Sequence, residues 1–68
     1  MPNDEPKDLT IAFAQVSDAE LMALAQLVKR IYWEDMRKLA VSDRETEQMA
    51  SAVVKLQDAL AEVGYAPR

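Results

Sequence analysis

Residues 42–64 read SDRETEQMASAVVKLQDALAEVG, and this stretch decides the fold. It opens with a Ser-x-x-Glu capping box, in which the Ser42 hydroxyl accepts an amide at the helix start and Glu45 reaches back. The apolar residues then recur at spacings of four, three, four and three, typical of a seam that packs on another helix: Met49, Val53, Leu56, Leu60 and Val63. Gly64, the chain's one glycine, stands where a left-handed C-cap ends a helix. We predict a long helix over 43–63, packed on a helix of its own chain or of a second copy.

Two further helices are predicted upstream. Ser17 and Glu20 form another capping box. The apolar residues that follow recur at spacings of mainly three and four and form one stripe: Leu21, Leu24, Leu27, Val28 and Ile31. The bulky and partly β-branched stretch 31–33 lowers helix propensity, so we expect a kink or a short break there. A short helix over 34–40 follows, and the capping box at Ser42 comes directly after it.

The segment 9–15 has the pattern of a strand. Large apolar residues at Leu9, Ile11 and Phe13 alternate with smaller ones, which places the large side chains on one face of an extended segment. A lone strand leaves its backbone groups unpaired, and the rest of the chain supplies no second candidate. We therefore expect this segment to pair with the same segment of a second copy.

The chain divides into a lead-in and one domain. Residues 1–8 carry two prolines and four charged groups, so we expect them to be disordered. Residues 9–68 are too few for more than one domain, and a domain of this size buries so little surface that a homo-oligomer is favoured. The predicted fold is mostly α: a short N-terminal strand followed by two or three helices, dimerising, within a single small helical domain over 9–68.

The composition excludes several kinds of chemistry. Among the 68 residues there is no cysteine and no histidine, so the common ligands of zinc, haem and iron–sulfur clusters are missing. No cofactor or metal site is predicted, and a chain without disulfides fits the cytoplasm. The formal net charge of -4 opposes attraction to phosphate backbones and anionic lipid, and no apolar run is long enough to cross a bilayer. We expect neither direct nucleic-acid binding nor membrane attachment.

The sequence also predicts no enzyme. Acid–base catalysis needs two groups that converge in a pocket, and only carboxylates, lysines and tyrosines are available for it. Glu34 and Asp35 are adjacent in the chain and so point to different sides of a helix. A phosphate-cradling glycine loop and a nucleophile elbow are both missing from the sequence. No catalytic residue is therefore predicted.

The residues that we expect to contact a partner are an aromatic and acidic group and a second acidic cluster: Tyr32, Trp33, Glu34 and Asp35, with Asp43, Glu45 and Glu47. Aromatic residues are enriched at the energetic centres of interfaces, but they also fill cores. Acidic residues in a first helical turn also serve as partners of the helix dipole. Four basic residues form either a further site or a solvated face neutralised by nearby acids: Lys29, Arg30, Arg37 and Lys38. The sequence leaves these alternatives open.

The order of a strand and two helices resembles the ribbon-helix-helix regulators, in which two copies pair their strands into a ribbon that enters the DNA major groove. In this likeness residues 9–14 are the ribbon, residues 17–18 open the first helix and residues 33–35 open the second. The resemblance implies a DNA-binding transcriptional regulator. The outward face of the ribbon departs from that family. It consists of Thr10, Ala12 and Ala14, and so it lacks the basic and amide side chains that read base edges.

Across most of its length the chain is similar to a group of short proteins encoded in proteobacterial mobile elements, such as prophages and conjugative elements. The residues that carry this likeness are 24–27, 29–31, Trp33, 37–40, 60–62 and 64–68. The likeness implies a context in which small acidic proteins inhibit host defence, anti-CRISPR proteins among them, by occupying a surface on a larger machine. Their acidity can stand in for nucleic-acid phosphates against a basic channel. We therefore expect a small non-enzymatic protein that binds and modulates a larger host protein or nucleoprotein complex, with the DNA-binding regulator as the alternative.

Overall fold

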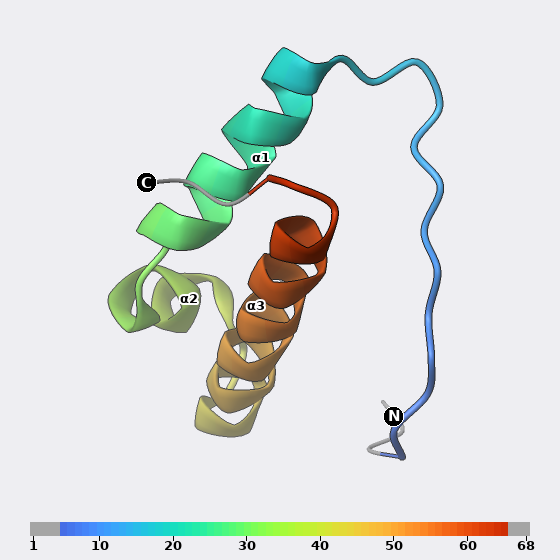
Figure 1. The fold of residues 1–68 in the computed structure, drawn as a ribbon. Helices are drawn as coiled ribbons and strands as arrows, with labels where there is room; N and C mark the ends of the chain where they lie inside the picture. The colour runs from blue at the N-terminus through green and yellow to red at the C-terminus, as the bar shows by residue number, and fades with distance from the viewer. Residues whose placement is uncertain (1–4, 66–68) are drawn as a thin grey trace.

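The structure is a computed structural model that describes residues 5–65, and three helices make up most of it: α1 (Asp18–Arg30), α2 (Trp33–Leu39) and α3 (Asp43–Glu62). The predicted mostly α class is confirmed. Within the described residues α3 packs against both α1 and α2, whereas α1 and α2 do not pack against each other. Figure 1 shows α2 beside the first half of α3 and α1 beside its second half. The long C-terminal helix is thus the element that holds the other two.

The starts of α1 and α3 follow their capping signals. The Ser17 hydroxyl accepts from the Glu20 amide and the Glu20 carboxylate accepts from the Ser17 amide, both at 3.0 Å, which completes the predicted box. At α3 the Ser42 hydroxyl accepts from the Glu45 amide at 3.1 Å. The Glu45 carboxylate, however, accepts from the Val41 amide at 3.2 Å, one residue farther out than predicted. Side-chain oxygens therefore satisfy amides that have no partner within the helix.

The end of α3 is a Schellman turn. Gly64 has a φ of 95°, the left-handed conformation that glycine adopts without steric cost. The Tyr65 amide donates to the Leu60 carbonyl at 2.8 Å, and the Gly64 amide donates to the Ala61 carbonyl at 3.1 Å. The predicted glycine C-cap is confirmed, and Tyr65 folds back against the apolar core.

The core is small. Its buried apolar residues are Ala25, Val28 and Leu60, which form one cluster between α1 and α3, and Met36 on α2. The predicted seam of α3 packs within its own chain, with Leu60 buried and three members partly buried: Met49, Val53 and Leu56. Val63 does not belong to the seam, because it is the C-cap residue and Tyr65 covers the cluster in its place. Thr46 extends the seam by one turn, and its hydroxyl donates to the Ser42 carbonyl at 3.1 Å, so this polar side chain is buried with a partner.

The apolar stripe of α1 is only partly covered. Val28 is buried, and three other members of the predicted stripe are partly buried: Leu21, Leu24 and Ile31. Leu27 stays exposed, because α3 is the only helix that packs on α1 and it covers the neighbouring Ala25 and Val28 instead. The predicted break after α1 is present, since Ile31 and Tyr32 both have an extended backbone.

Residues 5–17 form an extended arm beside the helices (Figure 1). No strand occurs within residues 5–65, so the single chain does not support the strand predicted over 9–15. A strand needs backbone hydrogen bonds to a neighbouring strand, and the described helices supply none to this segment. Of the predicted lead-in, residues 5–8 belong to the arm and have neither helix nor strand, and the remainder lies outside the described residues.

Candidate functional site

The segment from the start of α2 to the loop before α3 exposes large apolar side chains. We call the following four residues the α2 surface: Tyr32, Trp33, Leu39 and Val41, which are 72%, 44%, 70% and 88% exposed. Met36 is the one buried residue of α2. Trp33 and Leu39 lie three residues before and after Met36, so they flank it on the same side of the helix. The apolar stripe of α2 is therefore wider than the part that α3 covers.

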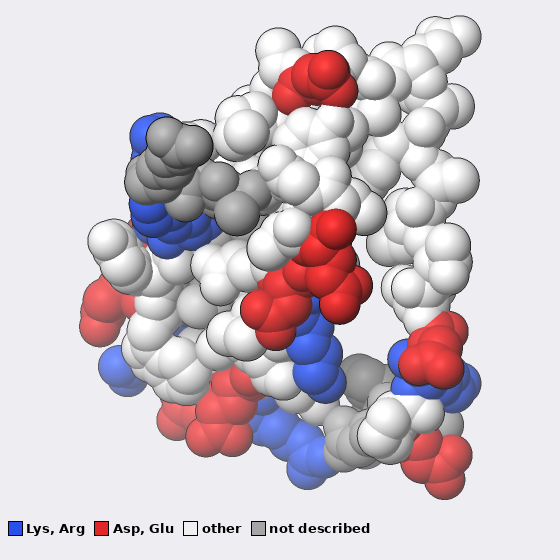
Figure 2. Space-filling view, viewed as in Figure 1, with Lys and Arg blue, Asp and Glu red and all other residues white. Residues whose placement is uncertain are grey.

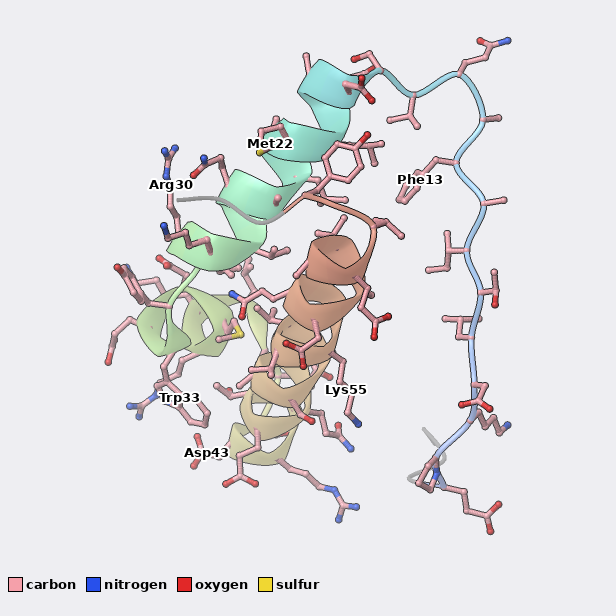
Figure 3. All side chains as sticks on the ribbon, viewed as in Figure 1. Phe13, Met22, Arg30, Trp33, Asp43 and Lys55 are labelled. Atoms are coloured by element: carbon pink, nitrogen blue, oxygen red, sulfur yellow. The ribbon has the colours of Figure 1, made fainter. Side chains whose placement is uncertain are left out.

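The two aromatic residues were predicted either as core or as interface. Tyr32 lies outside the core, and its hydroxyl forms no hydrogen bond with any residue between 5 and 65. Trp33 is partly covered, and Figure 3 shows it below α2, at the end of the molecule where Asp43 begins α3. Leu39 and Val41 were not named as site residues, because spacing alone does not show which apolar residues a neighbouring helix leaves uncovered.

The five predicted acidic contacts divide into two kinds. Asp35 accepts from the Tyr32 amide at 2.9 Å, and Glu45 accepts from the Val41 amide, so both act as helix caps. The other three are exposed and take no part in the capping bonds: Glu34, Asp43 and Glu47. Figure 2 shows acidic side chains scattered over this face among basic ones. Only these three remain open to an approaching partner.

The four basic residues do not form a patch across one helix face. The expected proximity of Lys29 and Arg37 required an unbroken helix, and the chain leaves the helical conformation at Ile31. Each basic pair instead occupies the last turn of its own helix, where positive charge is favoured by the helix dipole: Lys29 and Arg30 in α1, and Arg37 and Lys38 in α2. This position accounts for their pattern without a second site.

A shallow groove of about 300 Å³ runs between α1 and α3. Its floor is the core cluster of Ala25, Val28 and Leu60, and Lys29 and Asp58 lie at its edge. Gln57 also lines it, but its side-chain amide is engaged, because it donates to the Val28 carbonyl near the end of α1. The groove therefore offers an apolar floor with one basic and one acidic side chain at its edge.

Two titratable groups tie the start of α1 to its surroundings. Tyr65 donates its hydroxyl to the Asp18 carboxylate at 2.6 Å, and this bond raises the pKa of Tyr65 because it favours the protonated phenol. Hydrogen bonds from the Ser17 amide and then the Ser17 side chain lower the pKa of Glu20, because they favour its charged form. Glu20 is exposed and Tyr65 is partly buried, and each hydrogen-bonds to a residue at the start of α1.

The lowered pKa of Glu20 predicts an acid-sensitive helix start. A carboxylate with a depressed folded pKa stabilises the fold above its unfolded pKa of about 4.3, and this contribution is lost as the pH falls through the folded value. Glu20→Gln retains a hydrogen-bond acceptor but does not titrate. We expect its free energy of unfolding, measured with urea, to fall less between pH 5 and pH 3 than that of the wild type.

The matched control is Glu47→Gln, which removes an exposed carboxylate of α3 that caps no helix. Its pH dependence should follow the wild type. The same acid sensitivity in all three proteins would contradict the role of Glu20.

The part of the chain that the structure describes has neither a cluster of metal ligands nor a helix that could cross a membrane. No group of three or more acidic side chains between residues 5 and 65 is placed to hold a metal ion. None of the helices in that part of the chain combines the length and the apolar character that a membrane crossing requires.

The sequence matches the model of a known protein family over its whole given length. The model of one protein family, described as a family of unknown function, DUF7706, matches residues 1–68. The chain belongs to this family. No curated protein and no solved structure gives a match. The description of this family names no activity.

Proposed function

We propose that this protein is a small acidic, non-enzymatic protein of the cytoplasm that binds a larger protein or nucleoprotein complex and modulates it. The observation that carries this proposal is the exposure of the α2 surface beside a core that has only four buried apolar residues between positions 5 and 65. Side chains of tryptophan and tyrosine supply much of the binding energy when a partner covers them. The contact is formed by the α2 surface, with Glu34, Asp43 and Glu47 as its charged rim.

The accessible surface supports association. The chain exposes 5970 Å². A compact protein of 7.6 kDa exposes about 4,300 Å² by the scaling of surface with mass. The excess of about 1,700 Å² exceeds the roughly 800 Å² that each partner buries in a standard interface. It is large enough for both a partner contact and self-association, and we propose that the protein acts as a homodimer.

The acidity favours a basic surface on the partner. The net charge is -4, and the three rim carboxylates are not used for capping. A negative surface of this kind is attracted to a channel that normally holds nucleic-acid phosphates. Together with the likeness to mobile-element proteins, this favours an inhibitor of host defence, of the anti-CRISPR type, as the outcome of the contact.

Affinity capture of the tagged protein from cells that express it, with and without nuclease, tests this proposal. We expect a defined protein complex that is retained after nuclease treatment, read by mass spectrometry. Recovery that disappears with nuclease would contradict direct protein binding and would favour the DNA-binding alternative, as would a shift of duplex DNA by the purified protein at low salt.

A further inference from the structure

We propose that the arm is the self-association element, and that residues 8–14 of two copies pair as antiparallel strands centred on Ile11. This inference rests on the homodimer in the proposed function and names its contact. Within the described structure, the backbone amides and carbonyls of residues 9–14 form no hydrogen bond, although the segment is already extended. An extended segment with free backbone groups is ready to pair with another strand.

The side chains of the arm have two distinct faces. Leu9, Ile11 and Phe13 alternate along the segment, and each is more than half exposed. Figure 3 shows the Phe13 ring on the side of the arm that faces the helices. Since successive side chains of an extended chain point to opposite sides, Leu9 and Ile11 share that side with Phe13. In the single chain this apolar face lacks cover, because all three side chains remain exposed.

The ends of the extended stretch determine its centre. Gln15 has a φ of 55°, a left-handed conformation outside regular strand geometry, so the stretch ends at Ala14. Asp8, the last of the charged lead-in residues, precedes the alternating apolar side chains and forms the other end of the stretch. Residue 11 is the midpoint of 8–14, and antiparallel pairing about this point places Leu9 of one copy opposite Phe13 of the other. The apolar face is therefore complementary to itself.

The charges also favour a second copy. Residues 9–17 of the arm contain no charged side chain, and Figure 2 shows the arm uncharged along its length with charged groups gathered at its lower end. In the centred register Asp8 lies opposite Ala14 and Lys7 opposite Gln15, so no like charges meet across the strands. Two chains that each carry a net charge of -4 thus have an uncharged place to meet.

A two-stranded ribbon alone is only marginally stable in water, so its apolar face needs cover. In the single chain that face is directed toward the helices. In the dimer the same orientation places Leu9, Ile11 and Phe13 of both copies, six side chains in all, between the ribbon and the helices. The surface that the chain exposes beyond that of a compact protein of its mass, about 1,700 Å², exceeds the roughly 800 Å² that one side of a standard interface buries.

Cysteine cross-linking tests the register, because the chain has no cysteine of its own. Directly opposed residues of antiparallel strands have Cα atoms about 4.5 to 5.5 Å apart, within the range of a disulfide. Ile11→Cys should therefore form a disulfide-linked dimer at least about tenfold faster than Leu9→Cys or Phe13→Cys alone, whose equivalent positions lie about 13 Å apart. An equal mixture of Leu9→Cys and tagged Phe13→Cys should form the mixed dimer.

Ser51→Cys, on the exposed side of α3, gives the rate of random collision. Equal rates for the three arm variants, or rates no faster than that of Ser51→Cys, would overturn the proposal. Sedimentation of the wild type distinguishes a failure of the arm contact from a failure of the homodimer itself. A wild-type dimer without the cross-linking pattern overturns the arm contact and leaves the homodimer in place, whereas a monomer at every concentration overturns both.

Discussion

Leu60→Ala is expected to leave most of the chain unfolded at 37 °C. Leu60 is 6% exposed and lies at the centre of the one cluster that joins α1 to α3. Truncation of a buried leucine to alanine costs about 2 to 5 kcal/mol, because the removed methyl groups leave a cavity. A single core in a chain of this size supplies no more than about 3 to 5 kcal/mol in total. The mutation therefore removes most of the stability.

Far-ultraviolet circular dichroism against temperature measures this effect. The wild type should show the signal of three helices and one cooperative transition, whereas Leu60→Ala should have lost most of its helical signal at 37 °C. The matched control is Val63→Ala, which truncates an apolar residue of the same region that is 68% exposed. Val63→Ala should melt within a few degrees of the wild type, and an equally stable Leu60→Ala would show that the described core is wrong.

The parts of the fold that the sequence predicts well are those determined by near neighbours. Ser17 and Glu20 complete their capping box, and Gly64 forms the left-handed C-cap, because each bond spans only a few residues. The seam of α3 is also predicted well as far as Leu60, since its side follows from helical periodicity.

The remaining features depend on where other elements lie. Leu27 and Val63 fit the apolar pattern but stay exposed, because the neighbouring helix or Tyr65 covers other residues. Thr46 was missed because its polarity conceals a buried position that a bond to the Ser42 carbonyl makes possible. The strand over 9–15 was predicted from alternation together with pairing to a second copy, and a single chain lacks the second strand that a ladder requires.

In the candidate site, too, the features that depend on the packing of other elements were harder to predict than those that near neighbours determine. Their aromatic side chains identified Tyr32 and Trp33, but residue type did not distinguish core from surface, which depends on how much of α2 is covered by α3. Asp35 was predicted only as a partner contact and proves to be a cap, whereas Glu45 was predicted both as a cap and as a partner contact and does cap its helix. A carboxylate three residues after a helix start is the signal that indicates this use.

Trp33→Ala is expected to weaken binding to the captured partner by at least about tenfold while the helices remain intact. Tryptophan at the centre of an interface contributes about 2 kcal/mol or more when it is truncated, and 1.4 kcal/mol corresponds to a factor of ten. Trp33 is 44% exposed, so the rest of it packs against the protein and its removal also costs some stability. The melting temperature must therefore be measured together with the affinity. Leu39→Ala is the second variant, since Leu39 belongs to the same surface and is covered less than Trp33.

Isothermal titration calorimetry of the purified partner with four proteins shows whether the partner binds at the α2 surface: wild type, Trp33→Ala, Leu39→Ala and Val63→Ala. Figure 1 places the end of α3, where Val63 lies, away from α2, so this exposed residue serves as the control. Contact at the α2 surface predicts weaker binding by Trp33→Ala and Leu39→Ala at unchanged helix content, and wild-type affinity for Val63→Ala. Equal affinities for all four proteins would contradict it.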